Sequence, residues 1–81
     1  MYDAFIWITY DGNKGPVSMA CDYYFYNKDK KEFIIKNNHM YIAIPNITEH
    51  EGYELTKMIN DNVRTQMIDI NHYLSLIREK I

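Results

Sequence analysis

The sequence predicts an α+β fold in which a four-stranded antiparallel β-meander is followed by one long C-terminal α-helix, in the order ββββα. Two observations favour this class. Runs of β-branched and aromatic residues separated by turn-forming segments fill residues 1–45, and apolar residues recur every three or four positions within 48–81. A chain of 81 residues predicts a single domain over 1–81, with the sheet in 1–45 and the helix in 48–81.

Four runs in the first half of the chain have the composition of β-strands. The first run precedes DGNKGP, in which the Asp-Gly and Gly-Pro pairs are typical of turns. NKDKK and NNH separate the later runs, and Pro45 ends the last one. Loops this short predict antiparallel neighbours, because a parallel connection needs about a dozen residues or more. The predicted strands are 2–10, 17–26, 32–36 and 40–44.

A helix is predicted to begin soon after the last strand. Thr48 and Glu51 have the spacing of a capping box, and Glu49 and Glu54 add negative charge where the helix dipole favours it. From Leu55 onward one apolar stripe keeps the helical spacing. Its members are Leu55, Ile59, Val63, Met67, Ile70, Leu74, Ile77 and Ile81.

The segment NDN at 60–62 leaves two forms of this helix open. These residues cost about 2 kcal/mol relative to alanine in a helix, yet the apolar stripe keeps its phase across them. One form is a continuous or mildly kinked helix. The other breaks into two helices, with Asp61 or Asn62 capping the second.

The length of a continuous helix favours a homodimer. A helix over 48–81 would extend roughly 50 Å, whereas strands of five to nine residues span about 15–30 Å, so the helix would overhang its sheet. A second copy would cover the overhang; in the alternative, the stripe packs only on its own sheet. The residues predicted to mediate self-association are Val63, Met67, Ile70, Leu74, Ile77 and Ile81.

Alternation along the strands divides their side chains between a core face and a second, aromatic face. The pattern favours a core of Ile6, Ile8, Val17, Met19, Cys21, Phe25, Ile42 and Ile44. The opposite face would then carry Phe5, Trp7, Tyr24, Tyr26 and Tyr41. Which set faces the helix stays open, and cross-strand aromatic pairing would also explain these residues without a partner.

Tyr and Trp are enriched in protein interfaces, so the aromatic face predicts an intracellular protein–protein interaction module that occludes a surface of a larger protein. Ile, Asn, Lys and Tyr are abundant, which resembles AT-rich coding and favours a phage or mobile-element inhibitor of a host or defence protein. The alternatives are an oligomeric small-ligand or nucleotide sponge, a single-stranded nucleic-acid binder and a structural assembly subunit. The predicted partner-binding residues are Phe5, Trp7, Tyr24, Tyr26 and Tyr41 as anchors, with Lys28, Lys30 and Lys31 steering approach.

Other functional classes are disfavoured by composition and spacing. With a net charge of -2, the chain lacks the excess of basic residues that is typical of nucleic-acid binders. No apolar run is long enough to span a membrane, and the apolar N-terminal run does not have the pattern of a signal peptide. The single cysteine, Cys21, indicates a reducing, cytoplasmic setting. HEGYE at 50–54 lacks the second histidine of a metal-binding helix, and no nucleophile–base signature is present. We therefore expect no enzyme activity, no cofactor and no metal.

Overall fold

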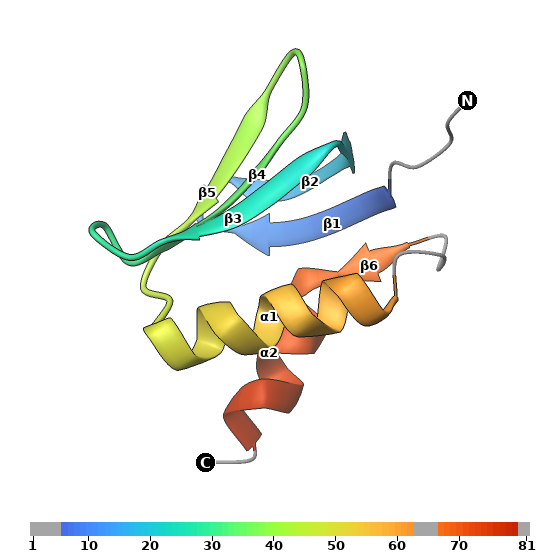
Figure 1. Ribbon diagram of the computed structural model, residues 1–81. Helices are drawn as coiled ribbons and strands as arrows, with labels where there is room; N and C mark the ends of the chain where they lie inside the picture. The colour runs from blue at the N-terminus through green and yellow to red at the C-terminus, as the bar shows by residue number, and fades with distance from the viewer. Residues whose placement is uncertain (1–5, 63–66, 80–81) are drawn as a thin grey trace.

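The computed structural model describes residues 6–62 and 67–79, which form an α+β fold with two sheets on one side and two helices on the other (Figure 1). The predicted α+β class is confirmed, but the order ββββα is wrong. Within the described residues the chain contains six strands, arranged as two three-stranded sheets, and the helical part is divided by a short strand. The elements are β1 (Ile6–Gly12), β2 (Gly15–Cys21), β3 (Tyr23–Asn27), β4 (Glu32–Lys36), β5 (Tyr41–Ile44), α1 (Glu49–Asp61), β6 (Ile68–Asp69) and α2 (Ile70–Glu79).

The first sheet has the strand order β2-β1-β6. β1 and β2 form an antiparallel hairpin, paired from Ile6 opposite Cys21 to Gly12 opposite Gly15. Gly15 has a φ of 98°, a left-handed conformation that glycine adopts without steric cost, so the predicted turn is confirmed at this position. β6 runs parallel to β1, with Ile68 next to Ile8. This parallel strand comes from the part of the chain predicted to be wholly helical.

The second sheet has the order β3-β4-β5, and its start corrects the predicted second strand. Residues 17–26 do not form one strand, because the chain bends at Asp22 and its two halves pair in different sheets. The Asp22 N–H donates to the carbonyl of Lys36 (3.1 Å), and the Asn37 side chain donates to the carbonyl of Ala20 (2.8 Å). These bonds satisfy backbone groups at the bend and hold the two sheets together.

α1 begins as predicted and ends earlier than predicted. The Thr48 hydroxyl accepts from the Glu51 N–H (3.2 Å) while the Glu51 carboxylate accepts from the Thr48 N–H (3.0 Å), which confirms the capping box. The helix ends at Asp61, where the Asn62 side chain donates to the carbonyl of Met58 (2.7 Å). The prediction of a continuous helix over 48–81 is therefore wrong.

The predicted alternative, a break within 60–62, is the form that the structure shows, although its capping residue differs. Asn62 caps the C-terminus of α1 and not the start of a second helix. The Asp69 carboxylate instead accepts from the His72 N–H (3.2 Å) in the first turn of α2. Low helix propensity and a side chain able to satisfy a terminal carbonyl explain why the helix stops at this point.

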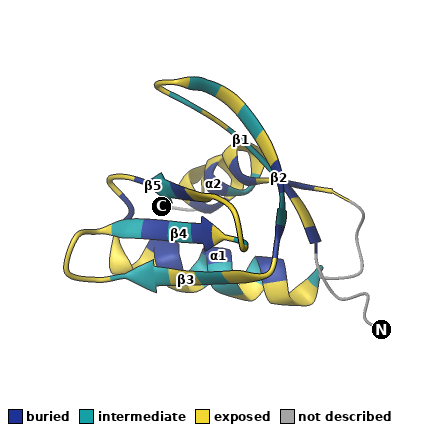
Figure 2. Ribbon diagram, turned by 90° about the horizontal axis from the view of Figure 1, so that it is seen from above, coloured by how far each residue is buried: buried dark blue, intermediate teal, exposed yellow. Residues whose placement is uncertain are grey.

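The core lies between the sheets and the helices, and α1 runs beneath β3 and β4 when the molecule is seen from above (Figure 2). Of the predicted core residues, Val17 is only half-buried and Phe25 is exposed. The physical reason for the second difference is the bend at Asp22, after which even-numbered residues point inward. The buried apolar residues are Ile6, Ile8, Met19, Cys21, Phe33, Ile35, Ile42, Ile44, Ile47, Leu55, Ile59, Ile68, Ile70, Leu74 and Ile77.

One ion pair joins the start of α1 to the end of α2. The Arg78 Nε donates to Glu51 Oε2 (2.8 Å), and its Nη2 approaches Glu51 Oε1 (3.4 Å) and the Asn46 carbonyl (3.5 Å). The hydrogen bond from Arg78 lowers the pKa of the Glu51 carboxyl, against the opposing effect of burial. Glu51 therefore caps its own helix and fixes the second helix at the same time. Neither α1 nor α2 is long and apolar enough to cross a membrane.

Candidate functional site

Three aromatic side chains lie exposed on the side of the second sheet that faces away from the core. Tyr23, Phe25 and Tyr41 are 57%, 37% and 67% exposed. The rings of Tyr23 and Phe25 are tilted against each other, with centroids 5.4 Å apart. The strand register puts Tyr23, Lys36 and Tyr41 in one row and Phe25, Ile34 and Ala43 in the next. We call these six residues the outer aromatic face.

Tyr24 and Tyr26, two of the predicted anchors, point the other way and pack against α1. The Tyr24 hydroxyl donates to the Asn60 side chain, and the Tyr26 hydroxyl donates to the carbonyl of Ile47. Burial raises the pKa of both phenols; a nearby Cys21 adds to the effect at Tyr24, and Glu49 and Glu51 add to it at Tyr26. Both tyrosines attach the helix to the sheet.

The remaining predicted anchors do not share one sheet. Trp7 is exposed on β1 in the first sheet, where its Nε1 donates to the Ser18 hydroxyl (2.7 Å). Tyr41 belongs to the outer aromatic face of the second sheet. Phe5 lies outside the described residues. The bend at Asp22 thus brings together Tyr23 and Phe25, which the sequence pattern did not select, with only one of the predicted aromatic anchors.

The predicted steering lysines occupy the turn between β3 and β4. Lys28, Lys30 and Lys31 are all exposed, and Asp29 lies among them. Lys31 has a φ of 55°, and its carbonyl accepts from the Ile47 N–H (2.9 Å), so the turn is tied to the segment that enters α1. The lysines therefore project from the end of the second sheet opposite to Lys36.

The residues predicted to mediate self-association are divided by the structure. Ile70, Leu74 and Ile77 are buried in the core of the single chain, while Met67 is exposed just before β6. Val63 and Ile81 lie outside the described residues. The argument from helix length no longer supports a homodimer, because α1 ends at Asp61. Self-association itself stays a prediction.

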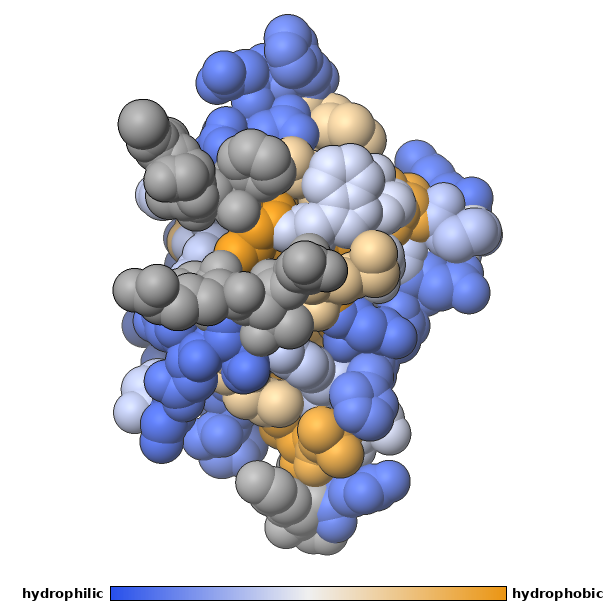
Figure 3. Space-filling model, turned by 90° about the vertical axis from the view of Figure 1, so that its right-hand side faces the viewer, coloured by the Kyte–Doolittle hydropathy of each residue, from blue (hydrophilic) through white to orange (hydrophobic). Residues whose placement is uncertain are grey.

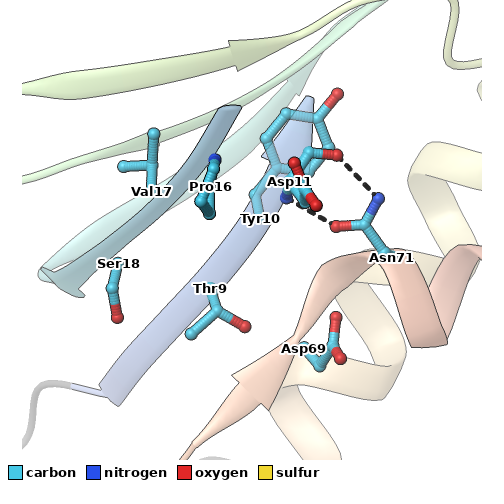
Figure 4. Close-up of a pocket in the computed structure, with 8 residues that line it drawn as sticks. All are labelled: Thr9, Tyr10, Asp11, Pro16, Val17, Ser18, Asp69 and Asn71. Carbon is cyan, nitrogen blue, oxygen red and sulfur yellow. Dashed lines mark hydrogen bonds between the residues drawn. The ribbon is translucent and has the colours of Figure 1, made fainter. Parts of the chain in front are cut away.

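A hollow of about 470 Å³ lies over the outer side of the first sheet (Figure 4). The Asn71 side chain closes one end of it by accepting from the Asp11 N–H (2.7 Å) and donating to the Asp11 carbonyl (2.9 Å). This side chain therefore bonds to β1 two residues beyond the last pair of the parallel ladder, Thr9 opposite Asp69. The other lining residues are Thr9, Tyr10, Pro16, Val17, Ser18 and Asp69.

A second hollow, of about 410 Å³, separates the β1–β2 hairpin from the edge strand β5. Its hairpin side carries Tyr10, Lys14 and Val17, and its sheet side is formed by β5 and Pro45. We call this hollow the β5 groove. Elsewhere, on the side of the molecule drawn in Figure 3, hydrophobic residues reach the surface in small areas between hydrophilic ones.

Across 6–62 and 67–79, no three His, Cys, Asp or Glu side chains are grouped as metal ligands. The Cys21 thiol is buried and donates to the Tyr23 carbonyl (3.2 Å), and burial raises its pKa. No known protein family, curated protein or solved structure matches the chain.

Proposed function

We propose that this protein is a small interaction module that binds a larger protein through the outer aromatic face. The observation that carries the proposal is the exposure of Tyr23, Phe25 and Tyr41 on one side of a three-stranded sheet. Aromatic side chains bring large contact area at a low cost in conformational entropy, and tyrosine adds a hydrogen-bonding group. These are the properties of residues that anchor protein interfaces.

Stabilisation of the fold is a weaker explanation for these residues. Direct cross-strand pairs contribute about 0.2–1 kcal/mol each, but Lys36 separates Tyr23 from Tyr41 in the register. More than half of each tyrosine remains exposed. A partner that covered the face would bury this aromatic area, and Lys36 would supply a charged group beside it.

The specific form of the proposal is occlusion of a surface on a host or defence protein by a phage or mobile-element inhibitor in the cytoplasm. The abundance of Ile, Asn, Lys and Tyr supports the coding origin, and the buried single cysteine fits a reducing compartment. Lys28, Lys30 and Lys31 would accelerate approach to an acidic region of the target.

The test is capture of partner proteins by the immobilised chain from an extract of the cells that express it, quantified by mass spectrometry. The Tyr23→Ser/Phe25→Ser double variant is expected to lose at least tenfold of the specific partner. Tyr53→Ser is the control, because Tyr53 is an aromatic residue on α1 that is at least as exposed as Tyr23 and Phe25. Equal capture by the double variant and the wild type, with both folded by circular dichroism, contradicts the proposal.

A small-ligand function makes a different prediction and is tested separately. A nucleotide at a hundred times its dissociation constant would stabilise the fold by about 2.7 kcal/mol, which a thermal-shift screen detects. A nucleotide that produces this shift, together with unchanged capture by the double variant, would replace the protein-binding proposal.

A further inference from the structure

The strand β5 is one edge of the second sheet, and its backbone groups alternate between the sheet and the β5 groove. The Asn37 N–H donates to the Met40 carbonyl (2.9 Å) across the turn between β4 and β5, which fixes the ladder. In an antiparallel pair the bonded positions alternate, so Ile42 and Ile44 bond to β4. Tyr41 and Ala43 then direct their N–H and C=O groups away from the sheet.

The described residues leave these outward groups unpaired. No backbone hydrogen bond from a turn, loop or cap within 6–62 and 67–79 reaches Tyr41 or Ala43. Exposed edges of this kind are templates for pairing with another strand, and proteins usually blunt them. β5 is only four residues long and is followed by Pro45, which has no N–H to offer. The short length of β5 and the proline after it limit an added segment to a short one, bonded at two positions, and the β5 groove beside the edge gives that segment room.

We propose that β5 takes up an extended segment of the partner protein as a fourth strand of its sheet, with a carboxylate of that segment beside Lys14. The inference rests on the proposed protein-binding function and names the kind of contact the partner makes. One set of alternate side chains would enter the β5 groove against Tyr10 and Val17, which are half-buried. The other set would extend the outer aromatic face beside Tyr41.

Charge favours an acidic partner segment over a second copy of this chain. Lys14 is the one charged side chain among the residues that line the β5 groove, so the groove favours an acidic segment. A second copy pairing its own edge would bring Tyr41–Ile44 into the groove, and this strand carries no carboxylate. Residues 37–40 and 45–48 on either side of it carry none either. A second copy would therefore add no ion pair with the exposed Lys14, whereas an acidic segment would add one.

The probe is a library of random heptapeptides displayed on phage and selected on the immobilised wild-type chain. Enriched peptides are expected to alternate apolar residues and to carry Asp or Glu. Ala43→Pro removes the outward N–H without removing a bond to β4, as edge strands allow, and is expected to weaken peptide binding at least tenfold. Ala43→Ser keeps the N–H and is the matched control. Lys14 lies in the turn between β1 and β2. Lys14→Glu reverses its charge and is expected to weaken peptide binding at least fivefold.

Several outcomes would overturn strand addition. Strand addition is refuted if the peptides bind the Ala43→Pro and Lys14→Glu variants with the same affinity as the wild type. It is also refuted if the library yields no enriched peptide. If peptide binding is lost only in the Tyr23→Ser/Phe25→Ser variant, the outer aromatic face is the binding site and the edge is excluded. A wild-type dimer that Ala43→Pro converts to a monomer in light scattering would assign the edge to a second copy. Amide hydrogen exchange checks the contact directly, because bound peptide is expected to slow exchange at Tyr41 and Ala43.

Discussion

Replacing Arg78 with methionine tests how the two helices are held together. The substitution removes the guanidinium from Glu51 and leaves a carboxylate whose side chain is only 8% exposed. Breaking a fully buried ion pair costs about 3–5 kcal/mol, whereas an exposed pair contributes about 0–1 kcal/mol. Because the Arg78 side chain is 48% exposed and the Thr48 N–H still donates to the carboxylate, we expect an intermediate loss of about 2 kcal/mol at pH 7.

The pH dependence of this loss has a defined sign. The Arg78 hydrogen bond lowers the pKa of Glu51 in the folded chain, below the value near 4.5 expected when the chain is unfolded. The pair therefore stabilises the fold fully above about pH 4.5 and progressively less as the pH falls through the lower, folded pKa. In Arg78→Met the largest cause of the lowered Glu51 pKa is gone and the bonds with Thr48 remain, so the difference between variant and wild type should shrink on acidification.

Urea unfolding followed by circular dichroism at pH 7 and pH 3 measures both effects. A loss of about 2 kcal/mol corresponds to a fall of about 8–16 °C in the melting temperature of a domain of this size. Lys57→Met is the control, because it removes an exposed positive charge from α1 that forms no ion pair among the described residues. A loss below about 0.5 kcal/mol at pH 7, or an equal loss at both pH values, would refute the reasoning.

Three further substitutions or modifications test other parts of the fold. Gly52→Ala would put a Cβ 2.5 Å from the Tyr26 ring, so overpacking should exceed the gain in helix propensity and lower the urea-unfolding free energy by about 1 kcal/mol. Asn71→Ala removes two hydrogen bonds to Asp11 and should accelerate amide exchange at Asp11 by about fivefold, equivalent to about 1 kcal/mol; unchanged exchange would contradict this. Cys21 is buried with a raised pKa, so a thiol reagent at pH 8 should modify it slowly in the native chain and rapidly in urea.

Local sequence signals predicted the parts of the fold that local interactions determine. The bounds of β4 agree with the prediction because turn-forming residues flank the strand on both sides. The capping box is likewise a short-range signal. The strand β6 has only two residues, so no alternation could indicate it. Ile70, Leu74 and Ile77 have helical spacing because α2 is itself a helix, so the apolar stripe gave no sign that the first helix stops at Asp61.

Whether the odd-numbered or the even-numbered aromatic residues of β3 face the core depends on a shift of one residue in the strand alternation. A period of two carried from Met19 through Cys21 would bury Phe25, but the bend at Asp22 reverses the faces. That bend is a tertiary feature, because β2 and β3 pair with different strands on its two sides. Composition alone gives no signal for it.

One sequence signal does indicate that a bulky side chain packs closely against α1. A glycine inside a helix costs about 1 kcal/mol relative to alanine, so Gly52 in α1 needs a packing reason. The Tyr26 ring lies where its side chain would be, and the neighbouring Tyr24 bonds to Asn60 two turns later. The aromatic run therefore performs two tasks. Its even-numbered members, Tyr24 and Tyr26, secure α1, whereas Tyr23 and Phe25 are exposed on the opposite side of the strand.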